Sequence, residues 1–250
     1  MRRLAAGLTL SLWASAVGAS AVAAAPCAPM SFEGRGHMLC SVAAGADVRL
    51  WLRDPQGEVW GGFARLARAL AAQGERLVFA MNAGMYHPDR APVGLFLGEG
   101  GAEGRLVTSA GPGNFGMLPN GVFCVLADGF AVIETRAFAA APPDCRAASQ
   151  SGPMLVIDGA LHPRFLPDAT SRFVRNGVGI SPDGRTAHFL ISDGPVTFQE
   201  FARAFRDGLG VPQALYFDGN VSRLYAPELG RADSGRRLGP IVGLVVPAGS

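Results

Sequence analysis

Hydrophobic residues occur in this chain as short apolar runs separated by glycine, proline, asparagine and aspartate. Runs of only a few residues between turn-forming residues are typical of strands that are buried on one or both faces. The pattern predicts strands at 47–53, 77–81, 93–97, 105–108, 122–126, 131–135, 154–157, 173–180, 186–191, 214–217 and 241–246.

Three turn signals lie between neighbouring runs and predict hairpins. They are Asp128-Gly129, Asp158-Gly159 and Pro182-Asp183-Gly184. Glycine supplies the positive φ that tight hairpin turns require, and aspartate bonds readily to the backbone of a turn. We assign no chemistry to these three aspartates.

Two segments have helical spacing instead. Phe63, Leu66 and Leu70 recur every three or four residues and predict a helix over 61–72. A second helix is predicted over 198–209, where Thr197 and Glu200 match the capping box that opens a helix. Because helices and hairpins interleave without a linker, we predict an α+β fold: a single domain over 26–250, with a mixed, twisted β-sheet that contains hairpins and is flanked by helices.

The first 25 residues are predicted to be a signal peptide rather than part of this domain. Arg2 and Arg3 precede an uncharged apolar stretch, and alanine-rich cleavage sites follow between about Ala21 and Ala25. The alternative is a membrane anchor, although the apolar stretch is short and poor in isoleucine and phenylalanine. We expect an exported protein, periplasmic or secreted, with no stable membrane insertion after cleavage.

Composition narrows the chemistry further. All 22 basic residues are arginine, so Schiff-base lysine chemistry and the lysine of phosphate-binding loops are excluded. Without Arg2 and Arg3, 20 basic residues face 20 acidic ones. A neutral mature protein argues against nucleic acid as the main partner.

The cysteines fit export. All four lie after the predicted signal peptide, at Cys27, Cys40, Cys124 and Cys145. An even number in an oxidising compartment predicts two disulfides. Of the three pairings we favour Cys27–Cys40 and Cys124–Cys145, because each closes a local loop. The spacing lacks the CxxC pattern of zinc sites, and we predict no metal site.

Polar residues gather beside glycine at the ends of several apolar runs. These residues are Asn82 and Gly84, Asn120, Ser151 and Gly152, Asp193, and Asp218 and Gly219. A buried strand can fix a polar side chain at its end, and glycine allows a ligand to approach the backbone. The alternative is that asparagine and aspartate are simply good turn residues.

Two carboxylates, Asp193 and Asp218, are the candidate catalytic pair. A pair of carboxyl groups can protonate a leaving oxygen and activate water or attack directly, as in glycosidases. Arg175 is the candidate cation for phosphate oxygens, although it could instead be a surface arginine on a hairpin. Glu200 is left out of the catalytic set because the capping box explains it.

The same residues carry a resemblance to a known family. The ordered segments MNAGMY (81–86), PNGVF (119–123), QSGPMLVIDGALH (150–162), RNGVGISPDG (175–184), ISDGPVTFQEFA (191–202) and ALYFDGNVS (214–222) resemble the phosphodiester glycosidases. The resemblance extends over about 47–246. It implies hydrolysis of a sugar-1-phosphodiester at its glycosidic bond, which releases the sugar and a phosphomonoester.

The family motifs match residue by residue, with one departure. Asn82 and Gly84 match an Asn-x-Gly turn, and Ser151 and Gly152 match a Ser-Gly pair before a strand. Arg175, Asp193, Asp218, Gly219 and Ser222 match the remaining positions of the family pattern. Asn220 and Val221 replace two glycines of that pattern, and bulkier residues there should reshape the site.

We therefore predict an exported hydrolase that acts on a sugar-1-phosphodiester or cell-envelope glycan, with an exopolysaccharide among the possible substrates. Asp193 and Asp218 are predicted to be catalytic. The predicted substrate-binding residues are Asn82, Gly84, Asn120, Ser151, Gly152, Arg175, Gly219 and Ser222. No cofactor is expected, and the oligomeric state is open. The alternatives are a non-catalytic envelope glycan-binding protein and a metal-dependent phosphodiesterase that uses the aspartates and asparagines as ligands.

Overall fold

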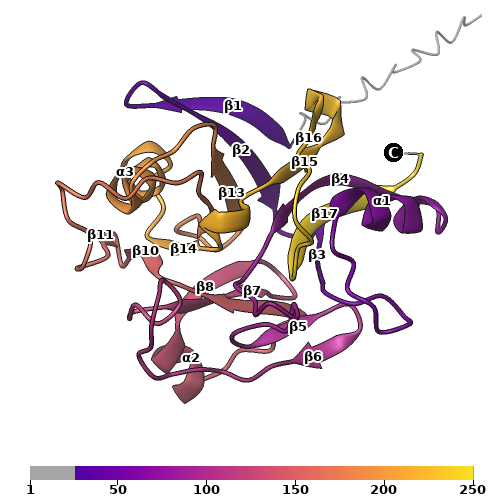
Figure 1. The fold of residues 1–250 in the computed structure, drawn as a ribbon, viewed down its shortest axis with the longest axis horizontal. Helices are drawn as coiled ribbons and strands as arrows, with labels where there is room; N and C mark the ends of the chain where they lie inside the picture. The colour runs from indigo at the N-terminus through magenta and orange to yellow at the C-terminus, as the bar shows by residue number, and fades with distance from the viewer. Residues whose placement is uncertain (1–25, 250) are drawn as a thin grey trace, which may run out of the picture.

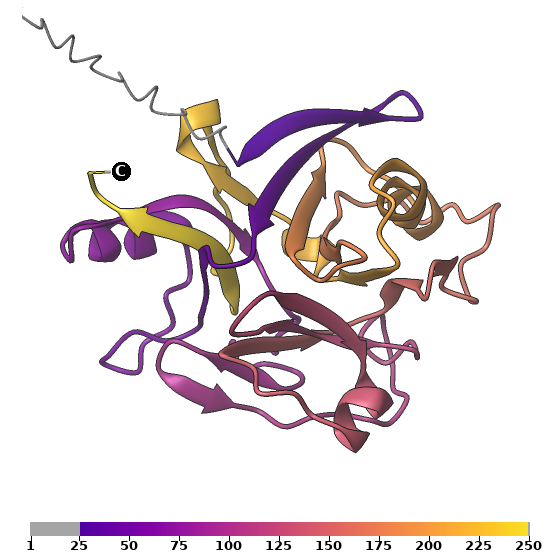
Figure 2. The same cartoon turned by 180° about the vertical axis from the view of Figure 1, so that it is seen from behind.

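The computed structural model describes residues 26–249, so the predicted signal peptide lies outside the described residues. Within that range the chain forms three β-sheets around a shared core, with a helix beside each sheet (Figures 1 and 2). Helix α1 (Phe63–Ala71) flanks the second sheet, α2 (Thr135–Ala140) the third and α3 (Phe198–Arg203) the first. The predicted α+β class is confirmed. No helix in this range has the length and apolar character needed to span a bilayer.

The sheets are built from strands that are distant in sequence. The first has the order β1 (Cys27–Phe32), β2 (Arg35–Ala43), β13 (Thr186–Ser192), β12 (Asn176–Ile180), β14 (Gln213–Tyr216), β10 (Met154–Ile157), β11 (Ala160–Leu161). The second has the order β16 (Arg231–Ala232), β15 (Leu224–Ala226), β4 (Glu75–Asn82), β17 (Ile241–Pro247), β3 (Asp47–Trp51). The third has the order β6 (Gly101–Glu103), β5 (Phe96–Gly98), β9 (Ala147–Ser151), β7 (Gly121–Val125), β8 (Phe130–Glu134).

Strand pairing in the described part of the chain is antiparallel. All pairs of labelled strands run in opposite directions, and parallel pairing is confined to one isolated bridge between Trp51 and Glu99. The three predicted hairpins are present as β7–β8, β10–β11 and β12–β13. The turn signals therefore identified the local pairing correctly.

Several strands and one helix were not predicted, and one predicted strand does not form. The elements that were not predicted are β1, β2, β6, β9, β15, β16 and α2. The β1–β2 hairpin escaped notice because β1 contains Pro29 and exposes much of its length. Helix α2 is short and begins directly after β8, where the Glu134 carboxylate accepts two backbone N–H bonds. The segment 105–108 is not a strand, because the Gln150 side chain bonds to both the N–H and the carbonyl of Val107 (3.0 and 2.7 Å).

Four phenylalanines join the sheets at the centre of the core. Phe79 on β4 packs against Phe189 on β13 with ring centres 5.4 Å apart. Phe123 on β7 contacts Phe189 at 5.7 Å and Phe217 at 6.3 Å, both edge to face. All four are fully buried. Truncating a buried phenylalanine to alanine costs about 3–5 kcal/mol, so this cluster strongly stabilises the arrangement of the three sheets.

The capping box at the start of α3 is confirmed. Thr197 Oγ1 accepts the N–H of Glu200 (3.2 Å), and Glu200 Oε2 accepts the N–H of Thr197 (2.8 Å). The Glu200 carboxylate also binds Arg35 and Arg172, each at 2.7 Å. Burial disfavours the charged form, but the Thr197 N–H and the two guanidinium groups outweigh it and lower the pKa of Glu200 to about 2.

We expect Glu200→Gln to lower the free energy of unfolding by about 1 kcal/mol at pH 7. The pKa of Glu200 is about 2 in the folded chain and 4.5 ordinarily, so its stabilisation is complete above pH 4.5 and is lost as the pH falls towards 2. Urea titrations of both proteins at pH 7 and pH 2.5 measure this. If the free energies of unfolding of the wild type and of Glu200→Gln differ by the same amount at pH 7 and at pH 2.5, the Glu200 carboxylate is not the source of the stabilisation.

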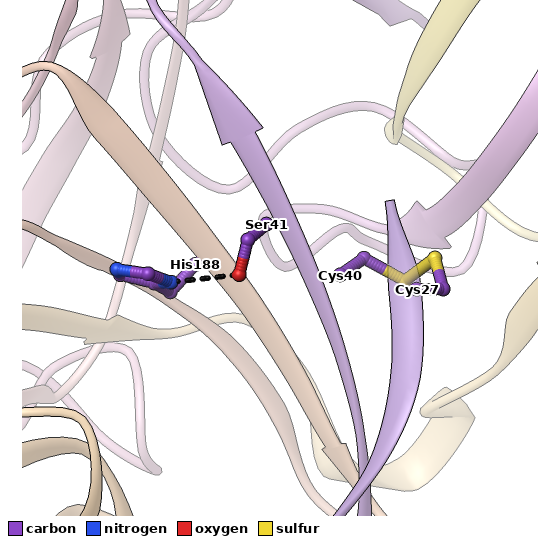
Figure 3. Close-up of a disulfide and its surroundings, with 4 residues drawn as sticks. All are labelled: Cys27, Cys40, Ser41 and His188. Carbon is purple, nitrogen blue, oxygen red and sulfur yellow. Dashed lines mark hydrogen bonds between the residues drawn. A yellow bond between two sulfur atoms is a disulfide. The ribbon is translucent and has the colours of Figure 1, made fainter. Parts of the chain in front are cut away.

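Both disulfides join residues that are close in sequence. Cys27 and Cys40 face each other on β1 and β2, and Cys124 on β7 is joined to Cys145. These are the pairs that the local-loop argument favoured. In Figure 3 the first disulfide lies beside Ser41, which hydrogen-bonds across the strand pair to His188 on β13 (2.9 Å). The disulfide and this bond tie β1, β2 and β13 together.

Peptide mapping of the exported protein without reductant is expected to recover these two links and no free thiol. The linked residues are 13 and 21 positions apart, and loops of this size stabilise a fold by about 3 kcal/mol when closed. Replacing both Cys124 and Cys145 by serine should lower the free energy of unfolding by about that amount. A peptide that links Cys27 to Cys145 would reject the pairing.

Candidate functional site

The candidate site forms where strands of two sheets end side by side. In the first sheet β12 lies between β13 and β14, with Asn176 opposite Ile191 and Gly177 opposite Tyr216. Residues just before β12 and just after β14 therefore meet at one end of the sheet. This register places Arg175 and Asp218 at the same end of the sheet, although they are far apart in sequence. The end of β4, at Asn82, reaches the same place from the second sheet.

Two buried asparagines connect the sheets at this point. Asn82 Nδ2 donates to Asn176 Oδ1 (3.2 Å), and Asn176 Nδ2 donates to the carbonyl of Asn82 (2.8 Å). Asn82 Nδ2 also donates to the Asp218 carbonyl (3.1 Å), while Asn82 Oδ1 accepts the N–H of Arg223 (3.0 Å). Every polar atom of the Asn82 side chain thus has a protein partner. The contacts favour a role in holding the site rather than in touching a substrate.

The turn that follows β14 is held by the same network. Ser222 Oγ lies 2.8 Å from the Asp218 carbonyl and 3.1 Å from Asn176 Oδ1. The N–H of Asp218 also points at Asn176 Oδ1 (3.4 Å). The backbone on both sides of the Asp218 carboxylate is therefore fixed. Asn176 was not predicted as a site residue, although it shows the same signal as Asn120, an asparagine directly before glycine at the start of a buried strand.

Arg175 is almost completely buried, with 1% of its surface exposed. Its guanidinium lies over the ring of Phe198 at 3.6 Å, with Tyr216 and Phe173 at 5.4 and 5.5 Å. It donates to the carbonyls of Val196 (2.9 Å) and Ser171 (3.3 Å), while Nη1 has no partner. Burial lowers the pKa of Arg175. Among the described residues no carboxylate pairs with this cation, which is an uncommon arrangement for a buried charge.

The other residues predicted to bind substrate lie on the third-sheet side of the site. Ser151 Oγ donates to the carbonyl of Phe217 (2.7 Å), directly before Asp218. Asn120 Nδ2 donates to the Phe115 carbonyl (2.8 Å), and its buried Oδ1 has no partner. The two glycines are tightly enclosed: a side chain on Gly152 would meet Asn120, and one on Gly84 would meet Gln150 and Ser149.

Asp193 is placed differently from Asp218. It follows β13 at the same end of the sheet, but its side chain is 49% exposed and binds Arg231 of β16 (3.1 Å). Its other oxygen lies against Gly36 on β2, on the side of β13 away from β12 and β14. Its catalytic role stays a prediction, as does that of Asp218.

Two tyrosines missed by the sequence analysis adjoin Asp218. Burial raises the pKa of Tyr216 to about 12; nearby Asp218 adds to the rise, while Arg175 and the Gly219 N–H oppose it. Burial, reinforced by Asp218, also raises the pKa of Tyr86. Tyr216 was predicted only as part of a buried strand, and nothing in its own segment indicates contact with Arg175. Within 26–249 no cluster of three or more histidines, cysteines, aspartates or glutamates could hold a metal ion.

In the described residues 26–249, this antiparallel α+β domain places a carboxylate and a buried arginine without a carboxylate partner at one end of a sheet, which marks a candidate functional site. The family model described as phosphodiester glycosidase matches residues 75–243, which include every site residue from Asn82 to Ser222. The chain therefore belongs to the phosphodiester glycosidase family.

Two known proteins show the extent of the similarity. The Escherichia coli (strain K12) protein named "Uncharacterized protein YigE" is 37% identical over 178 residues, which cover 71% of this chain and 69% of that protein. The solved catalytic domain of zebrafish N-acetylglucosamine-1-phosphodiester alpha-N-acetylglucosaminidase, auto-inhibited by its pro-peptide, superposes with a TM-score of 0.59 at 12% identity. That match covers 87% of this chain and 81% of the zebrafish one, and it shows a shared fold.

Proposed function

We propose that this protein hydrolyses the glycosidic bond of a sugar-1-phosphodiester and releases the sugar and a phosphomonoester. The observation that carries the proposal is the buried guanidinium of Arg175, which has no carboxylate partner among the described residues and lies beside the turn that presents Asp218. A desolvated cation without a counter-ion favours an anionic ligand, and a phosphodiester has one negative charge. Family membership points to the same substrate class.

The proposed roles follow from the contacts. Arg175 binds phosphate oxygens, and Asp218 acts as the acid, base or nucleophile at the anomeric carbon. Gly219, which has no side chain to displace the Tyr216 hydroxyl, keeps the turn in the shape that we propose binds the substrate. We propose that the remaining residues predicted to bind substrate shape the site. Those residues are Asn82 and Ser222 as supports of the Asp218 turn, and Gly84, Asn120, Ser151 and Gly152 as the third-sheet wall.

We propose two classes of substrate for this activity. The name of the zebrafish enzyme supports N-acetylglucosamine-1-phosphodiesters as the first compounds to test. Envelope glycans or exopolysaccharides with phosphodiester-linked sugars are the second group, since an exported enzyme would meet them.

A product assay tests the function. The purified mature protein is incubated with an N-acetylglucosamine-1-phosphodiester, and the products are separated by mass. We expect free sugar and a phosphomonoester, at the same rate with and without EDTA. Sugar-1-phosphate as the product, with loss of activity in EDTA, would indicate a metal-dependent phosphodiesterase instead. Binding without turnover would indicate a glycan-binding protein.

We further propose that the protein is exported to the periplasm or medium. The signal-peptide pattern at 1–25 and the two disulfides support this. The intact mass of the protein recovered from those fractions should correspond to cleavage between about Ala21 and Ala25. Recovery of a chain that retains residues 1–17 would reject the proposal.

A further inference from the structure

The hydroxyl of Tyr216 lies against the turn that presents Asp218. Tyr216 is the last residue of β14, and only 1% of its surface is exposed. A methyl group on Gly219 would overlap the tyrosine oxygen, so the backbone of Gly219 and the Tyr216 hydroxyl are already in close contact. Any side chain at position 219 would have to displace the phenol or the turn.

The same phenol is also next to Arg175. The guanidinium carbon lies 5.4 Å from the centre of the Tyr216 ring. Phe198 packs edge-on against that ring at 4.8 Å and lies under the guanidinium at 3.6 Å. Phe198, at the start of α3, thus contacts both the Tyr216 ring and the Arg175 guanidinium. Tyr216 is the neighbour through which the cation and the Asp218 turn are connected.

The charge state of the phenol fits a fixed contact rather than proton transfer. With its pKa raised to about 12, mainly by burial, Tyr216 is a neutral phenol at physiological pH. A neutral hydroxyl can accept a bond from the cation or from the Gly219 N–H and still donate its own proton. The Tyr216 hydroxyl can therefore stay in place while an anion binds to Arg175.

We propose that Tyr216 is a positioning residue that holds the guanidinium of Arg175 and the Asp218–Gly219 turn at a fixed separation. The inference rests on the proposed function, in which Arg175 holds the phosphate while Asp218 acts at the sugar. The phosphate and the sugar of the substrate must then be held at a fixed distance from each other. A shift of about 1 Å between such groups can lower a rate about a hundredfold.

Tyr216→Phe removes one oxygen atom and keeps the ring packing. We expect kcat on the N-acetylglucosamine-1-phosphodiester to fall roughly tenfold to a hundredfold, with a smaller change in KM. Tyr225→Phe is the matched control, because this ring packs against Phe63 on α1 and not on Arg175. It should keep the wild-type kcat. An unchanged kcat for Tyr216→Phe, or a rise in KM alone, would overturn the positioning role.

A second measurement does not depend on turnover. Gly219→Ala places a methyl group on the Tyr216 hydroxyl, so the melting temperature should fall more in the wild-type background than in Tyr216→Phe. We expect the drop to shrink by at least half when the oxygen is absent. Equal drops in both backgrounds would overturn the proposed contact. If the wild-type protein cleaves no phosphodiester but Gly219→Ala lowers the melting temperature less in the Tyr216→Phe background, the proposed function is wrong and the contact between Tyr216 and Gly219 is supported.

Discussion

Asp218→Asn is expected to lower the rate of phosphodiester hydrolysis at least a hundredfold while the melting temperature changes by only a few degrees. The substitution removes the charge and the proton acceptor but keeps the shape of the side chain, and general acid–base roles contribute about a hundredfold or more. The turn should survive, because Asn82 and Ser222 bind the backbone carbonyl of residue 218 rather than its carboxylate. Steady-state kinetics and thermal melts of the same preparations measure both effects.

Asp193→Asn is the parallel variant, because Asp193 is the second carboxylate of the predicted catalytic pair. It breaks an exposed ion pair with Arg231, which is worth at most about 1 kcal/mol. Loss of this ion pair alone should change the rate less than tenfold, whereas loss of the predicted catalytic role should lower it about a hundredfold or more. Comparable losses in both variants would support the predicted catalytic pair. An Asp218→Asn protein that melts early yet keeps wild-type turnover when folded would show that the carboxylate is structural.

Arg175→Lys is the second variant with a large expected effect. Lysine keeps the charge but lacks the planar fork that stacks on Phe198 and binds two oxygens at once. Loss of one charge-assisted hydrogen bond costs about 1.5–3 kcal/mol, which predicts a fall in kcat/KM of about tenfold to a hundredfold, mostly through KM. Titration with inorganic phosphate should show a parallel loss of affinity.

Arg172→Lys provides the control for Arg175→Lys. Arg172 lies three residues earlier on the same loop, where it binds the Glu200 carboxylate at the surface. Its substitution should leave kcat/KM unchanged. If Arg175→Lys keeps the wild-type KM and phosphate affinity, the anion-binding role of Arg175 is wrong.

Local signals in the sequence predicted much of the fold, and long-range contacts account for the rest. The Asp-Gly hairpins and the Thr197–Glu200 capping box depend on neighbouring residues, and the structure contains them. The β1–β2 hairpin carries little hydrophobic periodicity. It is positioned instead by a disulfide and by pairing with β13, more than 140 residues away along the chain.

In the candidate site, too, local signals indicate single residues, whereas long-range contacts decide which residues lie together. Arg175, Asp193 and Asp218 could all be nominated because each adjoins a buried strand, but the pattern did not indicate that Asp193 binds Arg231. Which side chains meet at the end of a sheet depends on strand order, which the sequence pattern does not specify. Tyr216 was missed for this reason, since its importance lies in partners from other strands. Asn176, in contrast, shows the same Asn-Gly signal as Asn120 and could have been nominated.

The central claim is that water attacks the sugar and not the phosphorus atom. Hydrolysis of an N-acetylglucosamine-1-phosphodiester in ¹⁸O-water, followed by ³¹P NMR of the phosphomonoester, tests it most directly. Cleavage of the glycosidic bond leaves all phosphate oxygens from the substrate in place, so we predict a phosphomonoester without label. A labelled phosphomonoester, or no turnover by the mature protein, would contradict the account.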